Sequence, residues 1–151
     1  MAWPSSLVYY RLLNQEVERR LGGHYSARCI LLSVDFAEIE RLQAAGDWER
    51  AGALLAEEAR RLDAAGIDVL LLATNTMHRV AAPIAAATRA RFLQIADALA
   101  HALGAAGMTR IGLLGTRYTM EGGFYAETLA RRGIETLVPD ASERQAVHDI
   151  I

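Results

Sequence analysis

The stretch from Ile67 to His78 constrains the fold more than any other part of the sequence. Val69 to Leu72 form an unbroken apolar run, which is too short for a buried helix but suits a strand covered on both faces. The sequence then turns polar at Thr74, Asn75 and Thr76, and an alanine-rich helical stretch follows. This order predicts a strand, a sharp polar turn and the start of a helix.

The polar turn at Thr74–Thr76 is a candidate ligand site. In open α/β sheets, ligands bind beyond the carboxyl ends of the strands. The free N–H groups and the dipole at the start of a helix favour an anion such as a carboxylate. Thr and Asn are also good helix N-caps, because their side-chain oxygens accept those same N–H groups. Both interpretations stay open, and the chemistry of the turn alone favours the cap.

Predicted strands alternate with predicted helices along the chain. The strands are expected at residues 29–34, 69–72, 92–95, 110–115 and 134–138. Strands separated by helices predict an α/β fold with a parallel sheet, helices on both faces and right-handed crossovers, as in a flavodoxin-like lobe. Cys29 lies inside the first of these strands, so we expect it to be a small buried apolar residue.

Polar residues mark where several helices begin. Ser5 or Ser6 can cap a first helix that ends near Leu21 with an apolar stripe on one face. Asp35 and Asp47 precede two further helices, and for Asp35 a capping role is favoured over a role in substrate binding. Another helix is expected after Asp140.

Composition limits the classes of function. Hydrophobic residues make up 52% of the 151 residues, which is enough for a real core. The net charge of −2 gives no reason to expect nucleic acid or an anionic membrane as a partner. Cys29 is the only cysteine, so we expect no internal disulfide and a reducing cytoplasm. We expect neither a signal peptide nor a membrane-spanning segment.

The turn also carries a resemblance to a known family. The segment from Ala73 to His78 resembles the Cys-Thr-Asn-Thr-Met-His segment of the aspartate/glutamate racemase family, in its aspartate racemase branch. Further segments are similar to family segments and follow in the same order: Met1-Ala2-Trp3, Tyr9 to Asn14, Ser33 to Phe36, Gly46-Asp47-Trp48 and Ile111 to Arg117. Together they cover essentially the whole chain, and their common order makes the resemblance specific.

Three departures from the family pattern concern catalysis and completeness. The first catalytic cysteine of the family falls on Ala73, which has no ionisable group. The second cysteine, in a Gly-Cys-Thr-Glu-like motif, is expected well past Ile151 and does not occur in the sequence. The glycine-rich strand that precedes Met-Ser-Trp in the family does not occur either. We therefore expect a racemase domain that is incomplete at both ends.

The resemblance implies racemisation of aspartate or glutamate without pyridoxal phosphate or another cofactor. One thiol removes the α-proton and a second thiol, from another lobe, delivers a proton to the opposite face. The resemblance implies that the substrate carboxylate is bound by Thr74, Asn75 and Thr76, with Thr116 and Thr119 facing them. A helix cap remains the alternative for each of these five residues.

The expected organisation is a first lobe in residues 1–97 and the beginning of a similar second lobe in residues 98–151. A second lobe with only two strands leaves a sheet edge open, so we expect a homodimer. Four histidines show no metal-ligand spacing, and His78 is expected to be an ordinary surface residue. A related decarboxylase or cis–trans isomerase stays possible. The competing hypothesis is a non-catalytic protein that binds acidic amino acids and has lost the base.

Overall fold

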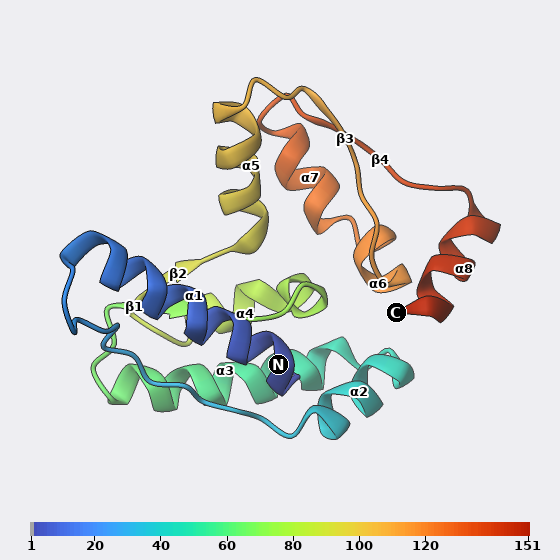
Figure 1. Ribbon diagram of the computed structural model, residues 1–151. Coiled ribbons are helices and arrows are strands. Elements are labelled where there is room, and N and C mark those ends of the chain that lie inside the picture. The colour runs from blue at the N-terminus through green and yellow to red at the C-terminus, as the bar shows by residue number, and fades with distance from the viewer. Residues whose placement is uncertain (1) are drawn as a thin grey trace. The chain divides into compact units, whose positions relative to one another are not determined.

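The computed structural model describes residues 2–151, which form two compact units (Figure 1). The first unit runs up to Thr74 and includes residues 82–92, and the second contains residues 75–81 and 93–151. The predicted lobe boundary between residues 97 and 98 stays a prediction. Within residues 2–151, none of the helices combines the length and apolar character that crossing a membrane requires.

The first unit begins with helix α1 (Trp3–Leu21). Ala2 occupies the N-cap position and Pro4 lies in the first turn, so the predicted cap at Ser5 or Ser6 is wrong. Proline is well tolerated there because the first N–H groups of a helix have no intrahelical partner. The apolar stripe on this helix includes exposed side chains: Leu7 is 56% exposed and Leu21 is 62% exposed.

Helices α2 (Phe36–Ala45) and α3 (Trp48–Ala64) pack against one another and carry much of the first unit's core. Asp35 caps α2 by accepting the Ala37 N–H at 3.0 Å. Asp47 caps α3 by accepting the Arg50 N–H at 3.1 Å. Both predicted caps are confirmed. The buried side chains include Ile39, Ala51, Leu55 and Ala59.

Strand β1 (Val69–Leu71) pairs with β2 (Arg91–Leu93). Leu70 alone is buried in β1, because its neighbours on either side point to the exposed face. The prediction that both faces of this strand are covered is therefore wrong. Residues 29–34 form no strand, and Cys29 is exposed. The buried strand predicted there is therefore wrong: an apolar run becomes a strand only where another strand pairs with it.

The second unit takes up the chain with a short 3-10 helix η1 (Thr76–Val80), and α4 (Ala81–Ala86) continues from it into the first unit. The remaining elements are α5 (Ile95–Ala105), β3 (Arg110–Gly112), α6 (Arg117–Met120), α7 (Phe124–Ala130), β4 (Glu135–Leu137) and α8 (Ala141–Ile150).

Strands β3 and β4 are parallel, with Arg110 opposite Glu135 and an ion pair of 3.1 Å between them. In the order of the sequence, helix α7 comes between the two strands. It packs on both β4 and α5 (Figure 1). The core of this unit is built around Ala100, Leu129 and Ile134. The predicted α/β class, with parallel strand pairing, is confirmed.

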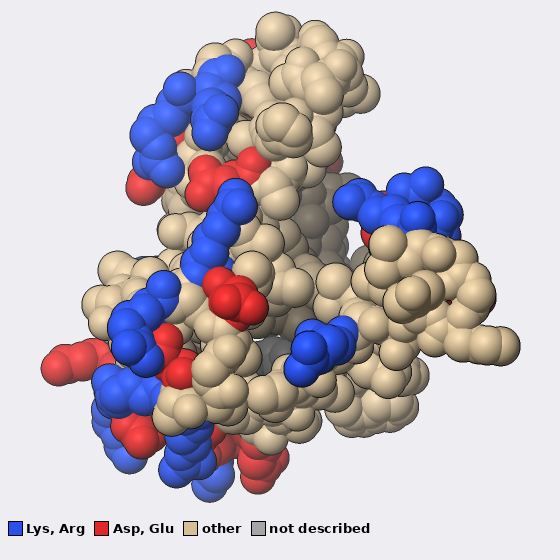
Figure 2. Space-filling view, turned by 90° about the vertical axis from the view of Figure 1, so that its left-hand side faces the viewer, with Lys and Arg blue, Asp and Glu red and all other residues tan. Residues whose placement is uncertain are grey.

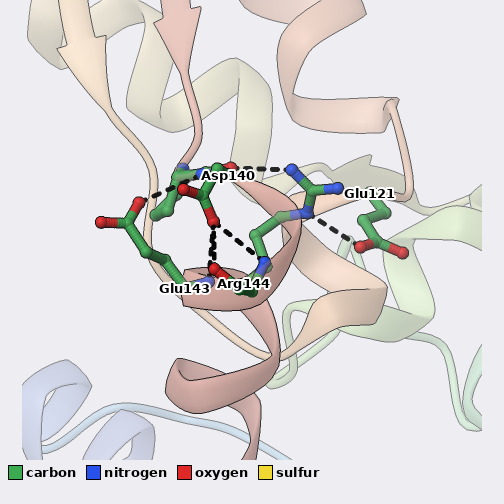
Figure 3. A network of polar contacts seen from close by, with 6 residues as sticks. Glu121, Asp140, Glu143 and Arg144 are labelled. Carbon is green, nitrogen blue, oxygen red and sulfur yellow. Dashed lines mark hydrogen bonds and ion pairs between the residues drawn. The ribbon is translucent and has the colours of Figure 1, made fainter.

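Helix α8 begins with a complete capping box, which fixes its direction (Figure 3). Asp140 accepts the backbone N–H of Glu143 at 2.9 Å, and the Glu143 carboxylate accepts the Asp140 N–H at 3.2 Å. Arg144 then donates to the Glu121 carboxylate at 2.8 Å and to the Pro139 carbonyl at 2.7 Å. These bonds tie the start of α8 to the end of α6.

Charged side chains of both signs lie next to one another on the face drawn in Figure 2. Several ion pairs of the chain join neighbours on one helix, such as Arg19 with Glu16 at 2.7 Å and Arg60 with Glu57 at 2.8 Å. Exposed pairs of this kind contribute little to stability. They do keep the surface mixed in sign, in agreement with the small net charge.

Candidate functional site

The candidate turn follows β1 directly and changes unit in its middle. Ala73 and Thr74 end the first unit, and Asn75 and Thr76 open the second unit at the start of η1. The Thr74 N–H donates to the Leu72 carbonyl at 2.8 Å. The N–H groups of Asn75 and Thr76 have no intramolecular acceptor within residues 2–151, so the turn offers two donors to an anion.

Asn75 occupies the N-cap position of η1 but makes no side-chain cap bond. The cap interpretation is therefore wrong for this residue. Its Oδ1 instead accepts the hydroxyl proton of Tyr125, with 2.7 Å between the two oxygens. The Asn75 side chain is exposed and its Nδ2 group makes no hydrogen bond within residues 2–151. The amide is thus anchored by its oxygen, and its two N–H donors remain available.

Thr116 and Thr119 lie together in the turn that follows β3. Their hydroxyl oxygens are 3.4 Å apart, and the Thr119 N–H donates to the Thr116 carbonyl at 2.8 Å. Thr116 sits at the N-cap position of α6 without a side-chain cap bond, so the cap interpretation is wrong here too. Thr119 is 5% exposed. The structure thus brings these two predicted residues together, while Asn75 contacts a residue that was not predicted.

His78 differs from the prediction of an ordinary surface residue. It is 3% exposed, and its ring is stacked on Phe124 with 6.2 Å between centroids. Phe124 in turn contacts the Tyr125 ring at 4.4 Å. Asn75, at the N-cap position of η1, and His78, within η1, therefore both contact the first turn of α7.

Arg117 is the cation nearest in sequence to the two threonines. Its side chain is exposed, and the guanidinium lies over the Tyr118 ring, 5.4 Å from the centroid. This cation–π contact occupies one face of the group and leaves its N–H donors facing water. Within residues 2–151, no cluster of His, Cys, Asp or Glu has the arrangement of a metal site.

The first unit contains a cavity of about 890 Å³ with mostly apolar walls. Ala73 and Cys29 both contribute to its lining, as do residues 27–32 and 67–72. Thr74, the residue after Ala73, belongs to the predicted set. It is half-buried and does not line this cavity. Ala73, the position that corresponds to the family's first cysteine, therefore lies in the wall of this cavity.

Comparison with protein families gives a match to the Asp/Glu/hydantoin racemase family over residues 1–151. The chain belongs to this family. The resemblance seen in the six sequence segments is confirmed, including its coverage of the whole chain.

This member of the Asp/Glu/hydantoin racemase family is similar to several solved structures. One is a candidate Asp/Glu racemase from Yersinia pestis, with 51% identity and a TM-score of 0.92. An aspartate racemase homologue from Pyrococcus horikoshii has 30% identity and a TM-score of 0.79. The chain is covered to 99% and 98% by these two and spans 65% of the length of each. The Picrophilus torridus aspartate racemase has 19% identity and a TM-score of 0.70. The match covers 97% of this chain and 68% of that racemase, and at this identity it supports the fold alone.

Tyr125 is the site residue that sequence reasoning missed in this family member. It lies 50 residues after Asn75, in α7. The available signal was general: a buried tyrosine nearly always hydrogen-bonds through its hydroxyl. That rule predicts a partner for Tyr125 but does not identify Asn75.

Proposed function

We propose that this chain is the acidic-amino-acid-binding part of a racemase that acts on aspartate or glutamate. The observation that carries the proposal is the family match over residues 1–151. The reaction would remove the α-proton on one face and return a proton on the other, without pyridoxal phosphate or another cofactor. The relatives from Yersinia and Pyrococcus, which are described as racemase-related proteins, support the same class of reaction.

The proposed carboxylate-binding residues are Thr74, Asn75, Thr76, Thr116 and Thr119. Two features support this set. Within residues 2–151 the N–H groups of Asn75 and Thr76 have no acceptor, and the Asn75 amide presents further donors. N–H groups that converge at the start of a helix suit a carboxylate, because the bonds are charge-assisted and the helix dipole adds to them. The paired hydroxyls of Thr116 and Thr119 would supply donors from a second turn.

Proton transfer is where the chain departs from the reaction. Ala73 occupies the position of the family's first cysteine and cannot accept a proton. The second cysteine does not occur in the sequence, and Cys29 lies exposed in an irregular segment. The proposal therefore assigns binding, but not turnover, to residues 1–151.

Ala73 also supports a second candidate function, a non-catalytic protein that binds acidic amino acids. The two functions share the binding residues and differ in the base. Replacing Ala73 by cysteine distinguishes them: α-proton exchange gained by that variant favours the racemase, and binding without any exchange favours the binding protein.

The proposed location and assembly are a cytoplasmic homodimer with no nucleic-acid or membrane partner. A single cysteine suits a reducing compartment. The apolar side chains exposed on α1, among them Leu7 and Leu21, would be covered by self-association. Sedimentation velocity tests the dimer, and a concentration-independent monomer contradicts it.

The replacement Thr76→Val tests the binding site. Valine keeps the shape of threonine and removes its hydroxyl. Thr76 starts η1 one residue after the N-cap position, so the cost expected of a lost cap does not apply, and we expect the melting temperature to stay nearly constant. The affinity for aspartate should fall about three- to tenfold, the range for one lost hydrogen bond.

Calorimetric titration with aspartate and glutamate, with alanine as the control ligand, measures the effect. Thr109→Val is the matched control, because Thr109 is exposed and lies outside the candidate turns. Lower stability with unchanged aspartate affinity in Thr76→Val would contradict the binding site.

A further inference from the structure

The hydroxyl of Tyr125 reaches Asn75 from the first turn of α7. The bond is short, at 2.7 Å between oxygens, and the tyrosine is 5% exposed. The bond is part-buried, and on the tyrosine side water competes little for it, because the Tyr125 ring is buried. Tyr125 therefore fixes the oxygen side of the Asn75 amide.

An asparagine amide has an acceptor on one side and two donors on the other. When Oδ1 accepts the Tyr125 hydroxyl, the Nδ2 group must point away from that helix. Asn75 is exposed, so this NH₂ group is accessible to a ligand. In the orientation that the structure shows, the oxygen side of the amide is bound and the donor side is left for a ligand.

A second contact keeps η1 and α7 in place. The His78 ring, one helical turn after Asn75, is stacked on Phe124 with 18° between the ring planes. Phe124 precedes Tyr125, and their rings are 4.4 Å apart. His78 and Tyr125 are both buried. Because η1 is held at two points, the Asn75 amide has little freedom to move away from Tyr125.

We infer that Tyr125 is a positioning residue that presents the Nδ2–H donors of Asn75 to a carboxylate group of an acidic amino acid. This role rests on the proposed function. It accounts for a polar contact between segments 50 residues apart, and it explains why Asn75 makes no cap bond at the N-cap position of η1. An amide preset in this way loses less orientational freedom when the ligand binds.

Two replacements separate presentation of the donors from support of the fold. Tyr125→Phe keeps the ring on Phe124 but removes the hydroxyl, which leaves the Asn75 amide free to rotate. Asn75→Asp keeps an acceptor for Tyr125 but places a negative oxygen where the NH₂ group was. Tyr25→Phe is the matched control, since Tyr25 is 64% exposed and lies in the other unit.

Aspartate affinity is measured by calorimetry well below the melting temperature, and the Asn75 side-chain NH₂ signals are recorded by ¹⁵N NMR without ligand. Tyr125→Phe should weaken aspartate binding about three- to tenfold and shift those NH₂ signals. Asn75→Asp should retain the melting temperature and weaken binding by about 30-fold or more, because like charges then face each other. Tyr25→Phe should change neither quantity.

A merely structural role would lower the melting temperature of Tyr125→Phe and leave the affinity and the Asn75 signals unchanged. That result overturns the positioning role and leaves the proposed function standing, since the wild-type chain still binds aspartate. Equal binding by Asn75→Asp also overturns the role. If the wild-type chain binds no acidic amino acid, the proposed function fails, and the role of Tyr125 fails with it.

Discussion

Replacing Gly115 by alanine should disturb the Thr116–Thr119 pair without touching either threonine. A Cβ atom at Gly115 would lie 3.1 Å from the Thr119 Cβ and 3.2 Å from its Cγ2. Thr119 is 5% exposed, so it cannot retreat into solvent. Overpacking of this kind typically costs about 1–3 kcal/mol. Since the two hydroxyls are already 3.4 Å apart, a shift of a few tenths of an ångström breaks their contact.

Gly112→Ala is the matched control, because nothing lies within 4 Å of a Cβ added at Gly112. Both replacements add the same methyl group to the same segment, so the entropy that alanine removes from the unfolded chain cancels in their difference. The difference in unfolding free energy should therefore be about 1–3 kcal/mol, measured by urea denaturation. Gly115→Ala should also bind aspartate more weakly. Equal stability of the two variants would refute the packing argument, and equal aspartate affinity would remove Thr119 from the site.

Two further predictions concern acid stability and turnover. The backbone N–H of Arg89 and the hydroxyl of Thr88 lower the pKa of the Asp63 carboxyl, at 2.7 Å and 2.9 Å. A lowered folded pKa stabilises the protein above the unfolded pKa of about 3.9, and this contribution disappears as the pH falls through the folded value. The stability difference between wild type and Asp63→Asn should thus shrink below about pH 4 in denaturation experiments, and a constant difference contradicts it. Separately, the chain should show no exchange of the aspartate α-proton in deuterated water above background, because a missing base costs about 10²–10⁴-fold; NMR detects any exchange.

Helix starts were predictable because their causes are local. Asp35, Asp47 and Asp140 each accept N–H groups two or three residues ahead, so the sequence window contains both partners. Strands depend on partners far along the chain. The run at residues 29–34 has strand-like composition but no strand beside it among the described residues, and Cys29 is accordingly exposed. Composition alone could not show which apolar runs would find a pairing partner.

The candidate site divides in the same way. The position of the Thr74–Thr76 turn after β1 followed from the change from apolar to polar residues. The hydrogen bond of the Asn75 side chain could not be predicted from the sequence, because its partner, Tyr125, lies 50 residues away. Local rules favoured a cap, and a tertiary contact replaced it. The burial of His78 has the same cause, since Phe124 covers its ring from the same helix.

In the proposed function, binding and proton transfer would depend on different parts of the molecule. Asn75 and the two threonines after β3 are held by contacts within the second unit, through Tyr125 and the close approach of Gly115 to Thr119. Ala73 belongs to the first unit and takes part in none of these contacts. Loss of an ionisable group at Ala73 therefore leaves the supports of the proposed carboxylate site intact. It follows that affinity for acidic amino acids, rather than turnover, is the property by which residues 1–151 are to be tested.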